Sequence, residues 1–136
     1  MAIICQINSP ISPEQYVQLV TKCQVELPTP SHYLIKGMLD DTNLLVSAWS
    51  QEGNDAHELV GIARCNSDFS HSCRIAELLV RPEFQSQDVA ELLIKTIETQ
   101  LTPSCLMMVM TKNLPDTTFK KLGFENHNQT WVKLAD

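Results

Sequence analysis

The stretch PEFQSQDVAELLI, residues 82–94, has the pattern of a turn that leads into a helix. The start of a helix attracts anions, because its first backbone N–H groups lack intrahelical acceptors and its dipole is positive there. Turns that hold a phosphate usually carry glycines, which let the backbone approach the anion closely. This turn has none, and Asp88 stands where a phosphate would sit. Two interpretations follow: an anion site whose glycines are replaced, or a helix start stabilised by its own acidic residue.

A second chemically notable residue is Glu77, a lone carboxylate within the apolar segment CRIAELLV, residues 73–80. Strand alternation would place Glu77 on one face with Ile75 and Leu79. Burial of an unpaired charge is expensive, so a carboxylate here needs a specific reason. One reading is a solvent-facing or edge residue that pairs with Arg64 or Arg81; the other is a carboxylate retained for chemistry.

The elements that would position these residues follow from hydrophobic periodicity and capping signals. The first half predicts a strand at 2–7 and a helix that begins with Ser12 as N-cap and Pro13 at its first position. This helix would bury one face, formed by Tyr16, Leu19, Val20 and Cys23. A shorter helix at 31–41 would bury Leu34, Ile35, Met38 and Leu39, and strands at 43–51 and 57–67 would form a hairpin.

The second half predicts a strand at 73–82, a helix capped by Ser86 that runs to about Leu101, and a strand at 105–110 covered on both faces. The apolar stripe of that helix would comprise Val89, Leu92, Leu93, Ile97 and Leu101, and Met107, Met108 and Met110 would fill the core. A short helix would end at Gly123, and a last strand would occupy 130–134. The order β-α-α-β-β-β-α-β-α-β predicts an α/β fold with a mixed sheet.

Composition limits the classes of function. The chain has 136 residues, which suits a single domain, and its net charge of −6 argues against non-specific nucleic-acid binding. No apolar run is long enough for a membrane span, and the start has no signal-peptide pattern, so we expect a cytoplasmic location. The five cysteines lack C-x-x-C spacing and the histidines lack ligand spacing, so we expect no metal.

Four segments together are similar to the GNAT superfamily of acyl-coenzyme A-dependent N-acetyltransferases. ELVGIAR (58–64) resembles its third strand, and AELLVRPEFQ (76–85) its fourth strand and cofactor turn. QSQDVAELLI (85–94) stands at the place of the motif R/Q-x-x-G-x-G/A. FKKLGFE (119–125) resembles the Y-x-x-x-G-F near the C-terminus. The resemblance covers the chain from about residue 43 onward and implies the GNAT fold.

The resemblance implies how acetyl-coenzyme A would bind. The pantetheine arm would pair with backbone groups of Leu78, Leu79 and Val80, and an N–H near Leu79 or Val80 would stabilise the oxyanion. The pyrophosphate would lie on the turn formed by Gln85, Ser86, Gln87, Asp88, Val89 and Ala90. Gln85 and Ala90 match the motif, whereas Asp88 replaces its central glycine. We expect this charge to weaken cofactor binding, and Asp88→Gly to strengthen it.

Further roles are implied in the same way. Glu77 would be the general base or hold a water for the amine. Phe119 replaces the tyrosine that protonates the leaving thiolate, and its simpler role is to pack with Leu122 and Phe124. Asn113 would contact the cofactor or cap a turn. His32 and Tyr33 lie in the segment that lines the acceptor pocket.

The resemblance therefore implies acyl transfer from acetyl-coenzyme A to a primary amine by direct attack. Asp88 and Phe119 favour an alternative, a GNAT-fold protein without catalysis that acts as a coenzyme A sensor or interaction module. A third reading is a structural dimer subunit whose last strand pairs with a partner chain.

Overall fold

The computed structural model describes residues 2–52, 56–110 and 114–135. The elements follow in the order β1 (Ala2–Ile7), α1 (Pro13–Cys23), α2 (His32–Asp40), β2 (Leu44–Glu52), β3 (Ala56–Ser67), β4 (Ser72–Val80), the 3-10 helix η1 (Pro82–Gln87), α3 (Val89–Glu98), β5 (Leu106–Val109) and α4 (Asp116–Lys121). This is a mixed α/β fold, and the predicted element order is confirmed as far as the short helix α4.

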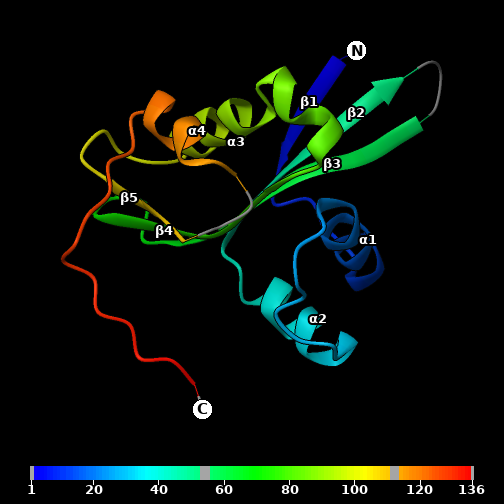
Figure 1. The fold of residues 1–136 in the computed structure, drawn as a ribbon, viewed down its shortest axis with the longest axis horizontal. Coiled ribbons are helices and arrows are strands. Elements are labelled where there is room, and N and C mark those ends of the chain that lie inside the picture. Colours follow the sequence, from blue (N-terminus) through cyan, green and yellow to red (C-terminus); the bar gives the residue numbers. More distant parts are fainter. Residues whose placement is uncertain (1, 53–55, 111–113, 136) are drawn as a thin grey trace.

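The strands form one mixed sheet in the order β1-β2-β3-β4-β5. The first four strands pair antiparallel, whereas β4 and β5 pair in parallel, with Ser72–Ile75 opposite Leu106–Val109. Helices α3 and α4 lie on one face of the sheet, and α1 and α2 lie on the other (Figure 1). The chain thus has the expected antiparallel meander followed by a β-α-β unit.

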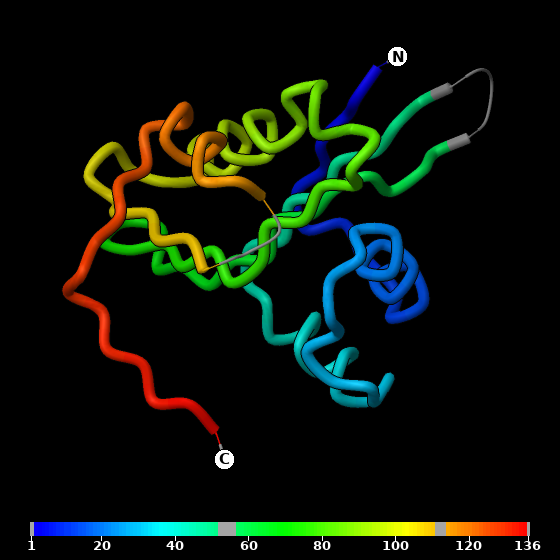
Figure 2. The backbone as a smooth tube through the Cα atoms, in the orientation of Figure 1, coloured from blue at the N-terminus to red at the C-terminus, as the bar shows by residue number. Residues whose placement is uncertain are grey.

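Each face of the sheet has its own hydrophobic core. The α3 side buries residues that include Val46, Val60, Leu78, Val80, Leu93 and Ile97. The α1 side buries residues that include Leu19, Val20, Ile35, Leu45, Ile62 and Leu79. The tube in Figure 2 shows how the helices of each side follow the twisted sheet between them. The predicted face of α1, formed by Tyr16, Leu19, Val20 and Cys23, is buried as expected.

Helix α1 begins where the sequence predicts. The Ser12 hydroxyl accepts the Gln15 backbone N–H at 3.1 Å, and the Gln15 side-chain oxygen accepts the Ser12 backbone N–H at 3.0 Å. This capping box satisfies two backbone donors at once, and Pro13 follows at the first helical position. The start of α1 is therefore fixed locally, which sets the direction in which Tyr16 projects toward the sheet.

A β-bulge changes which residues of β4 share a face. Arg64 lies opposite Glu77 and Cys65 lies opposite Ile75, so Ala76 is an extra residue on β4. Such an insertion reverses the side-chain alternation beyond it. Ile75 packs in the core on the α3 side, whereas Leu79 packs in the core on the α1 side, with Tyr16. The expectation that Glu77 shares a face with both is correct for Leu79 and wrong for Ile75.

The helix after β4 is shorter than predicted. Residues 82–87 form η1, in which Ser86 is an interior residue, so the prediction that Ser86 caps the helix is wrong. Asp88 then has a left-handed backbone, and α3 runs from Val89 to Glu98, short of the predicted end at Leu101. Tighter 3-10 turns are common where a helix begins, and the left-handed residue separates the two segments.

Several apolar residues that were expected in the core are exposed. Leu34 of α2 is 55% exposed, and Leu92 of α3 is 38% exposed, because each lies on the outer flank of its helix. Met107 and Val109 of β5, and Cys105 just before it, pack toward the α3 side. Leu106, Met108 and Met110 face the other way and are exposed, so the expectations of a doubly covered strand and of core-filling Met108 and Met110 are wrong.

The predicted last strand is also absent. Residues 124–135 are extended but pair with no strand in the described chain, and Trp131 is 97% exposed. Figure 1 shows this segment running away from the sheet. A short alternating segment forms a strand only when it pairs with the edge of another strand, and residues 130–134 pair with none in the described chain. The order therefore ends at α4.

Candidate functional site

The turn between β4 and α3 has the backbone conformation that a glycine would supply. Asp88 has φ 58° and ψ 29°, which is the left-handed region. Glycine enters this region without cost, and aspartate and asparagine tolerate it better than other residues. Asp88 therefore preserves the local path of the chain at the position where the motif has its central glycine. Its side chain makes no capping hydrogen bond, so it is not a simple helix cap.

Side chains of the turn hold it against the end of β4. The Gln85 amide Nε2 donates to the Val80 carbonyl at 3.1 Å. Phe84 is buried, and the Arg81 guanidinium carbon lies 5.4 Å from the centre of its ring. Arg81 also forms ion pairs with Glu58 at 3.1 Å and Glu83 at 2.6 Å. Gln85 thus has a structural role in addition to the cofactor role that was predicted.

Gly61 of β3 lets α3 lie close to the sheet at this point. A Cβ atom at Gly61 would lie 2.9 Å from the Leu79 carbonyl oxygen. It would also lie 3.3 Å from side-chain atoms of Val89 and Leu93. A larger residue would separate β3 from β4 or push the first turn of α3 away. The absence of a side chain at Gly61 therefore allows the first turn of α3 to lie close to β3.

A pocket of about 90 Å³ lies between the start of α3 and helix α4. One wall comprises Gln85, Asp88, Ala90 and Glu91, and the other comprises Thr118, Lys121 and Leu122. The structure thus brings together three of the predicted cofactor residues. Ser86 and Gln87 are exposed outside this wall, and Val89 is buried.

The pocket also meets the start of α3. The Leu92 N–H is the first amide that donates within the helix, to the Asp88 carbonyl at 3.0 Å. The N–H groups of Val89, Ala90 and Glu91 therefore have no intrahelical acceptor. Such N–H groups are the donors that a helix start offers to an anion, and the anion site expected from the sequence stays a prediction.

Lys121 is a residue of this pocket that the sequence analysis missed. Its Nζ lies 3.6 Å from Asp88 Oδ1, and the two side chains are 72% and 65% exposed. The pair joins the last turn of α4 to the turn before α3, although the residues are far apart in sequence. The available signal was the pair of lysines in FKKLGF, together with an uncompensated aspartate in the turn.

Phe119 packs as a core residue of α4. It is partly buried against the core on the α3 side, together with Leu122 and Phe124. Its ring meets the ring of Phe124 edge to face, with centroids 6.0 Å apart. The simpler role that was expected for Phe119 is therefore what the structure shows. Thr118, the preceding residue, is the hydroxyl-bearing side chain that lines the pocket.

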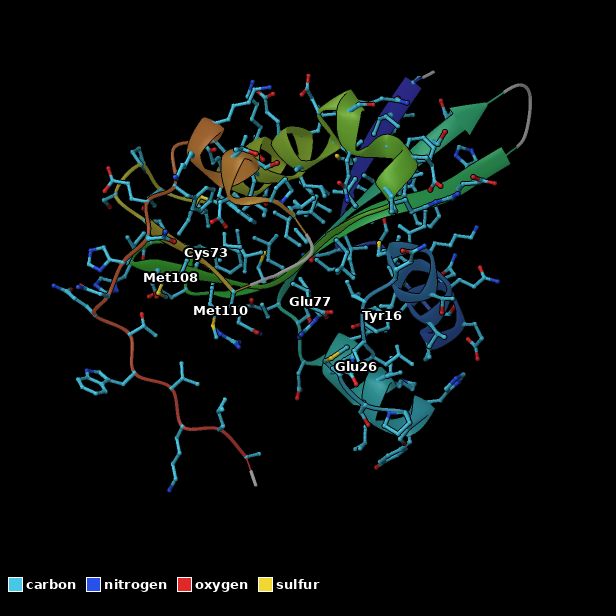
Figure 3. All side chains as sticks on the ribbon, in the orientation of Figure 1. Tyr16, Glu26, Cys73, Glu77, Met108 and Met110 are labelled. Atoms are coloured by element: carbon cyan, nitrogen blue, oxygen red, sulfur yellow. The ribbon has the colours of Figure 1, made fainter. Side chains whose placement is uncertain are left out.

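Glu77 lies in a half-buried polar cluster between α1 and the sheet. Its Oε2 accepts the Tyr16 hydroxyl at 2.6 Å, and its Oε1 accepts Arg64 Nε–H at 2.7 Å. The Glu77 and Arg64 side chains are 18% and 14% exposed. Figure 3 shows Tyr16 of α1 directed toward Glu77. The pairing with Arg64 that was one of the two interpretations is present, but in the interior and not at a sheet edge.

Tyr16 was predicted as a core residue, and its hydroxyl contact was missed. Burial raises the pKa of Tyr16 above its ordinary value, and the hydrogen bond to Glu77 raises it further. Tyr16 is therefore a neutral donor. The signal was available, since a buried tyrosine hydroxyl needs a partner. Each oxygen of Glu77 retains a second acceptor position, but Glu77 lines neither of the two pockets described in this section.

The end of β4 is where the resemblance places the thioester. Leu78, Leu79 and Val80 are buried and lie opposite Ala63, Ile62 and Gly61 of β3. Their parallel neighbour β5 pairs with β4 as far as Ile75. Residues 111–113, which include Asn113, lie outside the described residues.

The predicted acceptor residues lie at the start of α2. His32 Nδ1 is 3.8 Å from Glu14 Oε1, and Tyr33 is 83% exposed. A second pocket, of about 190 Å³, lies between α1 and the hairpin of β2 and β3, next to Arg81. Neither His32 nor Tyr33 lines this pocket or the pocket beside α3.

Within the described ranges, no group of three or more histidine, cysteine or acidic side chains is placed to hold a metal ion. Within the same residues, no helix is long and apolar enough to cross a membrane. Cys23, Cys65 and Cys73 are buried thiols, as expected for small core residues.

Solved structures with a similar fold include acetyltransferases and probable acetyltransferases. A probable acetyltransferase from meticillin-resistant Staphylococcus aureus superposes with a TM-score of 0.72 at 18% identity, over 98% of this chain and all of that one. A GNAT-family acetyltransferase from Streptococcus pneumoniae gives 0.72 at 16% identity, over 97% and 98%. AAC(6′)-Iy, solved with a bisubstrate analogue containing coenzyme A, gives 0.66 at 17% identity, over 100% and 99%.

The sequence itself matches a family model. Residues 21–133 match the acetyltransferase (GNAT) domain, so the chain belongs to the GNAT acetyltransferase family. No curated protein matches the sequence at a significant level. The family and its structural neighbours support acyl transfer as the general activity, and the resemblance noted in the sequence is confirmed.

Proposed function

We propose that the protein is a single-domain, cytoplasmic N-acyltransferase that moves an acetyl or other acyl group from acyl-coenzyme A to a primary amine. The observation that carries the proposal is the left-handed turn at Asp88, which leads directly into the N-terminus of α3 beside a pocket shared with α4. The backbone there follows the path that the motif glycine would allow, even though the glycine is absent. The complex of AAC(6′)-Iy supports coenzyme A as the donor.

In the proposed reaction the amine nitrogen attacks the thioester carbonyl carbon, and the C–S bond breaks to release coenzyme A. Backbone N–H groups near Leu79 and Val80 would stabilise the oxyanion. Glu77, or a water that it holds, would take the proton lost by the amine. The thiolate would receive a proton from water or from Thr118, because Phe119 has none to give.

A non-catalytic coenzyme A sensor is the second candidate. The hydrogen bonds of Glu77 favour this candidate, because its two oxygens already accept from Tyr16 and Arg64. A carboxylate engaged by two strong donors is less available as a base. Phe119, which lacks the expected hydroxyl, favours the same reading.

Two measurements separate these candidates. Acetyl-coenzyme A should raise the thermal unfolding temperature, because a ligand that binds only the native state stabilises it. Thiol release should then depend on an added amine from a panel of primary amines. Stabilisation without thiol release would support the sensor, and the absence of stabilisation would contradict both.

We also propose a homodimer as the assembled form. The support is the set of apolar side chains that a lone chain exposes to water: Leu106 and Met108 on β5, Met110 just after it, and Trp131 and Leu134 in the C-terminal segment. Contiguous patches of exposed apolar side chains commonly mark interaction surfaces. Light scattering during size-exclusion chromatography measures the molar mass, and a monomer at micromolar concentration would contradict the proposal.

A further inference from the structure

The charges around the pocket beside α3 do not suit an anion unless Lys121 takes part. Two carboxylates, Asp88 and Glu91, belong to the α3 wall. Lys121 is the only cationic residue that lines this pocket in the described part of the chain. Lys95 pairs with Glu91 at 3.0 Å but lies outside the lining. Without Lys121 the pocket would present negative charge and a helix N-terminus to the same ligand.

Asp88 cannot be replaced freely, because its backbone is left-handed. Glycine takes that conformation without cost, and asparagine and aspartate tolerate it better than most other residues. An aspartate at this position therefore tolerates the left-handed backbone but adds a negative charge that would repel a bound phosphate. The ion pair with Lys121, at 3.6 Å, places a compensating charge from α4 on the opposite wall.

We propose that Lys121 is a phosphate-binding residue of the coenzyme A site, and that it balances the charge of Asp88 so that the turn can accept a diphosphate. The inference rests on the proposed function, because it takes coenzyme A as the ligand. The ion pair is exposed, and exposed pairs are weak, so Lys121 can turn from the carboxylate toward a phosphate at little cost. Its ammonium group has three N–H donors and can contact both partners at once.

Charge balance makes the two residues act in opposite directions. Loss of Lys121 leaves the charge of Asp88 uncompensated and should weaken coenzyme A binding by about five- to twentyfold. This factor corresponds to the lower part of the range of repulsion energies between two like charges about 4 Å apart, because both groups are exposed to water. Loss of the Asp88 charge should strengthen binding by a similar factor. Loss of both restores the original charge of the pocket, so the affinity should return to within about threefold of the wild type.

The experiment is a double-mutant cycle measured by isothermal titration calorimetry with coenzyme A. The variants are Lys121→Gln, Asp88→Asn and the double variant. Asparagine removes the charge of Asp88 but keeps a residue that accepts a positive φ. Lys120→Gln is the matched control, because Lys120 is exposed on the same helix, outside the pocket lining, and the net charge of the protein changes equally. Urea unfolding of each variant checks that the fold is retained.

The expected result is weaker binding for Lys121→Gln, stronger binding for Asp88→Asn, near-wild-type binding for the double variant and no change for Lys120→Gln. The differences should shrink from about 0.1 M to about 1 M salt, where the Debye length falls from about 10 Å to about 3 Å.

Three results would overturn the inference. If the wild type does not bind coenzyme A, the proposed function fails and the inference fails with it. If the wild type binds but Lys121→Gln matches Lys120→Gln, the proposed function stands and the role of Lys121 is wrong. A double variant as weak as Lys121→Gln would contradict charge balance.

Discussion

The Tyr16→Phe substitution tests the polar cluster that joins α1 to the sheet. It removes one oxygen and keeps the buried ring, so it creates no large cavity. The lost contact is a 2.6 Å hydrogen bond to the Glu77 carboxylate. Hydrogen bonds to charged groups contribute about 1.5–3 kcal/mol to stability, and we expect the free energy of unfolding at pH 7 to fall by that amount. Urea unfolding followed by circular dichroism measures the change.

The same substitution should alter the dependence of stability on pH. Folding raises the pKa of Tyr16 above its ordinary value of 10, through burial and the bond to Glu77. Its contribution is therefore complete below pH 10 and is lost as the pH rises toward the folded-state value. Between these pH values the unfolded chain has lost the Tyr16 proton and the native chain has kept it. The wild type should lose up to about 1.4 kcal/mol per pH unit more than Tyr16→Phe.

A control separates this effect from the general ionisation of tyrosines. Tyr33 is 83% exposed, and Tyr33→Phe should change stability by less than about 0.5 kcal/mol at pH 7. The reasoning is refuted if Tyr16→Phe is as stable as the wild type at pH 7. It is also refuted if the difference between these two proteins stays constant from about pH 9 to about pH 11.

Three other substitutions test separate features of the fold. Gly61→Ala places a methyl group 2.9 Å from the Leu79 carbonyl, so it should cost at least about 1–3 kcal/mol in urea unfolding, and a neutral effect would contradict the close approach of β3 to β4. Phe119→Tyr should raise the rate of thiol release if the pocket is catalytic, and an unchanged rate would mean that the added hydroxyl does not reach the leaving group. Asp68 accepts the N–H groups of His71, Ser72 and Ser70, which hold its pKa below the ordinary 3.8. Its stabilising contribution should be present above that pH and lost as the pH falls through the lowered pKa, and Asp68→Asn should flatten the acid side of the stability curve.

Features that depend on nearby residues were predictable from the sequence. The start of α1 follows from Ser12 and Pro13, and its buried face follows from helical spacing. The hairpin of β2 and β3 follows from two alternating segments with a polar connection. The positive φ of Asp88 could have been predicted, because the resemblance places a glycine at this position and aspartate is among the residues that can replace it.

Features that depend on distant contacts were not predictable. The bulge at Ala76 has no signal of its own, and it alone separates the face of Glu77 from that of Ile75. The partner of Glu77, Tyr16, lies 61 residues away. The exposure of Met108 and Met110 depends on which helices cover β5, which an apolar sequence cannot reveal.

The two departures from the family pattern therefore have different consequences. Asp88 keeps the backbone conformation of the missing glycine, and its charge faces a lysine on the opposite wall. We expect a compensated charge to reduce the affinity for coenzyme A only modestly. Phe119 has no comparable substitute within its own side chain, because the ring packs against Phe124 and carries no proton. Binding and catalysis can thus be lost separately in this fold, and the thiol-release assay, more than the affinity, decides between an enzyme and a sensor.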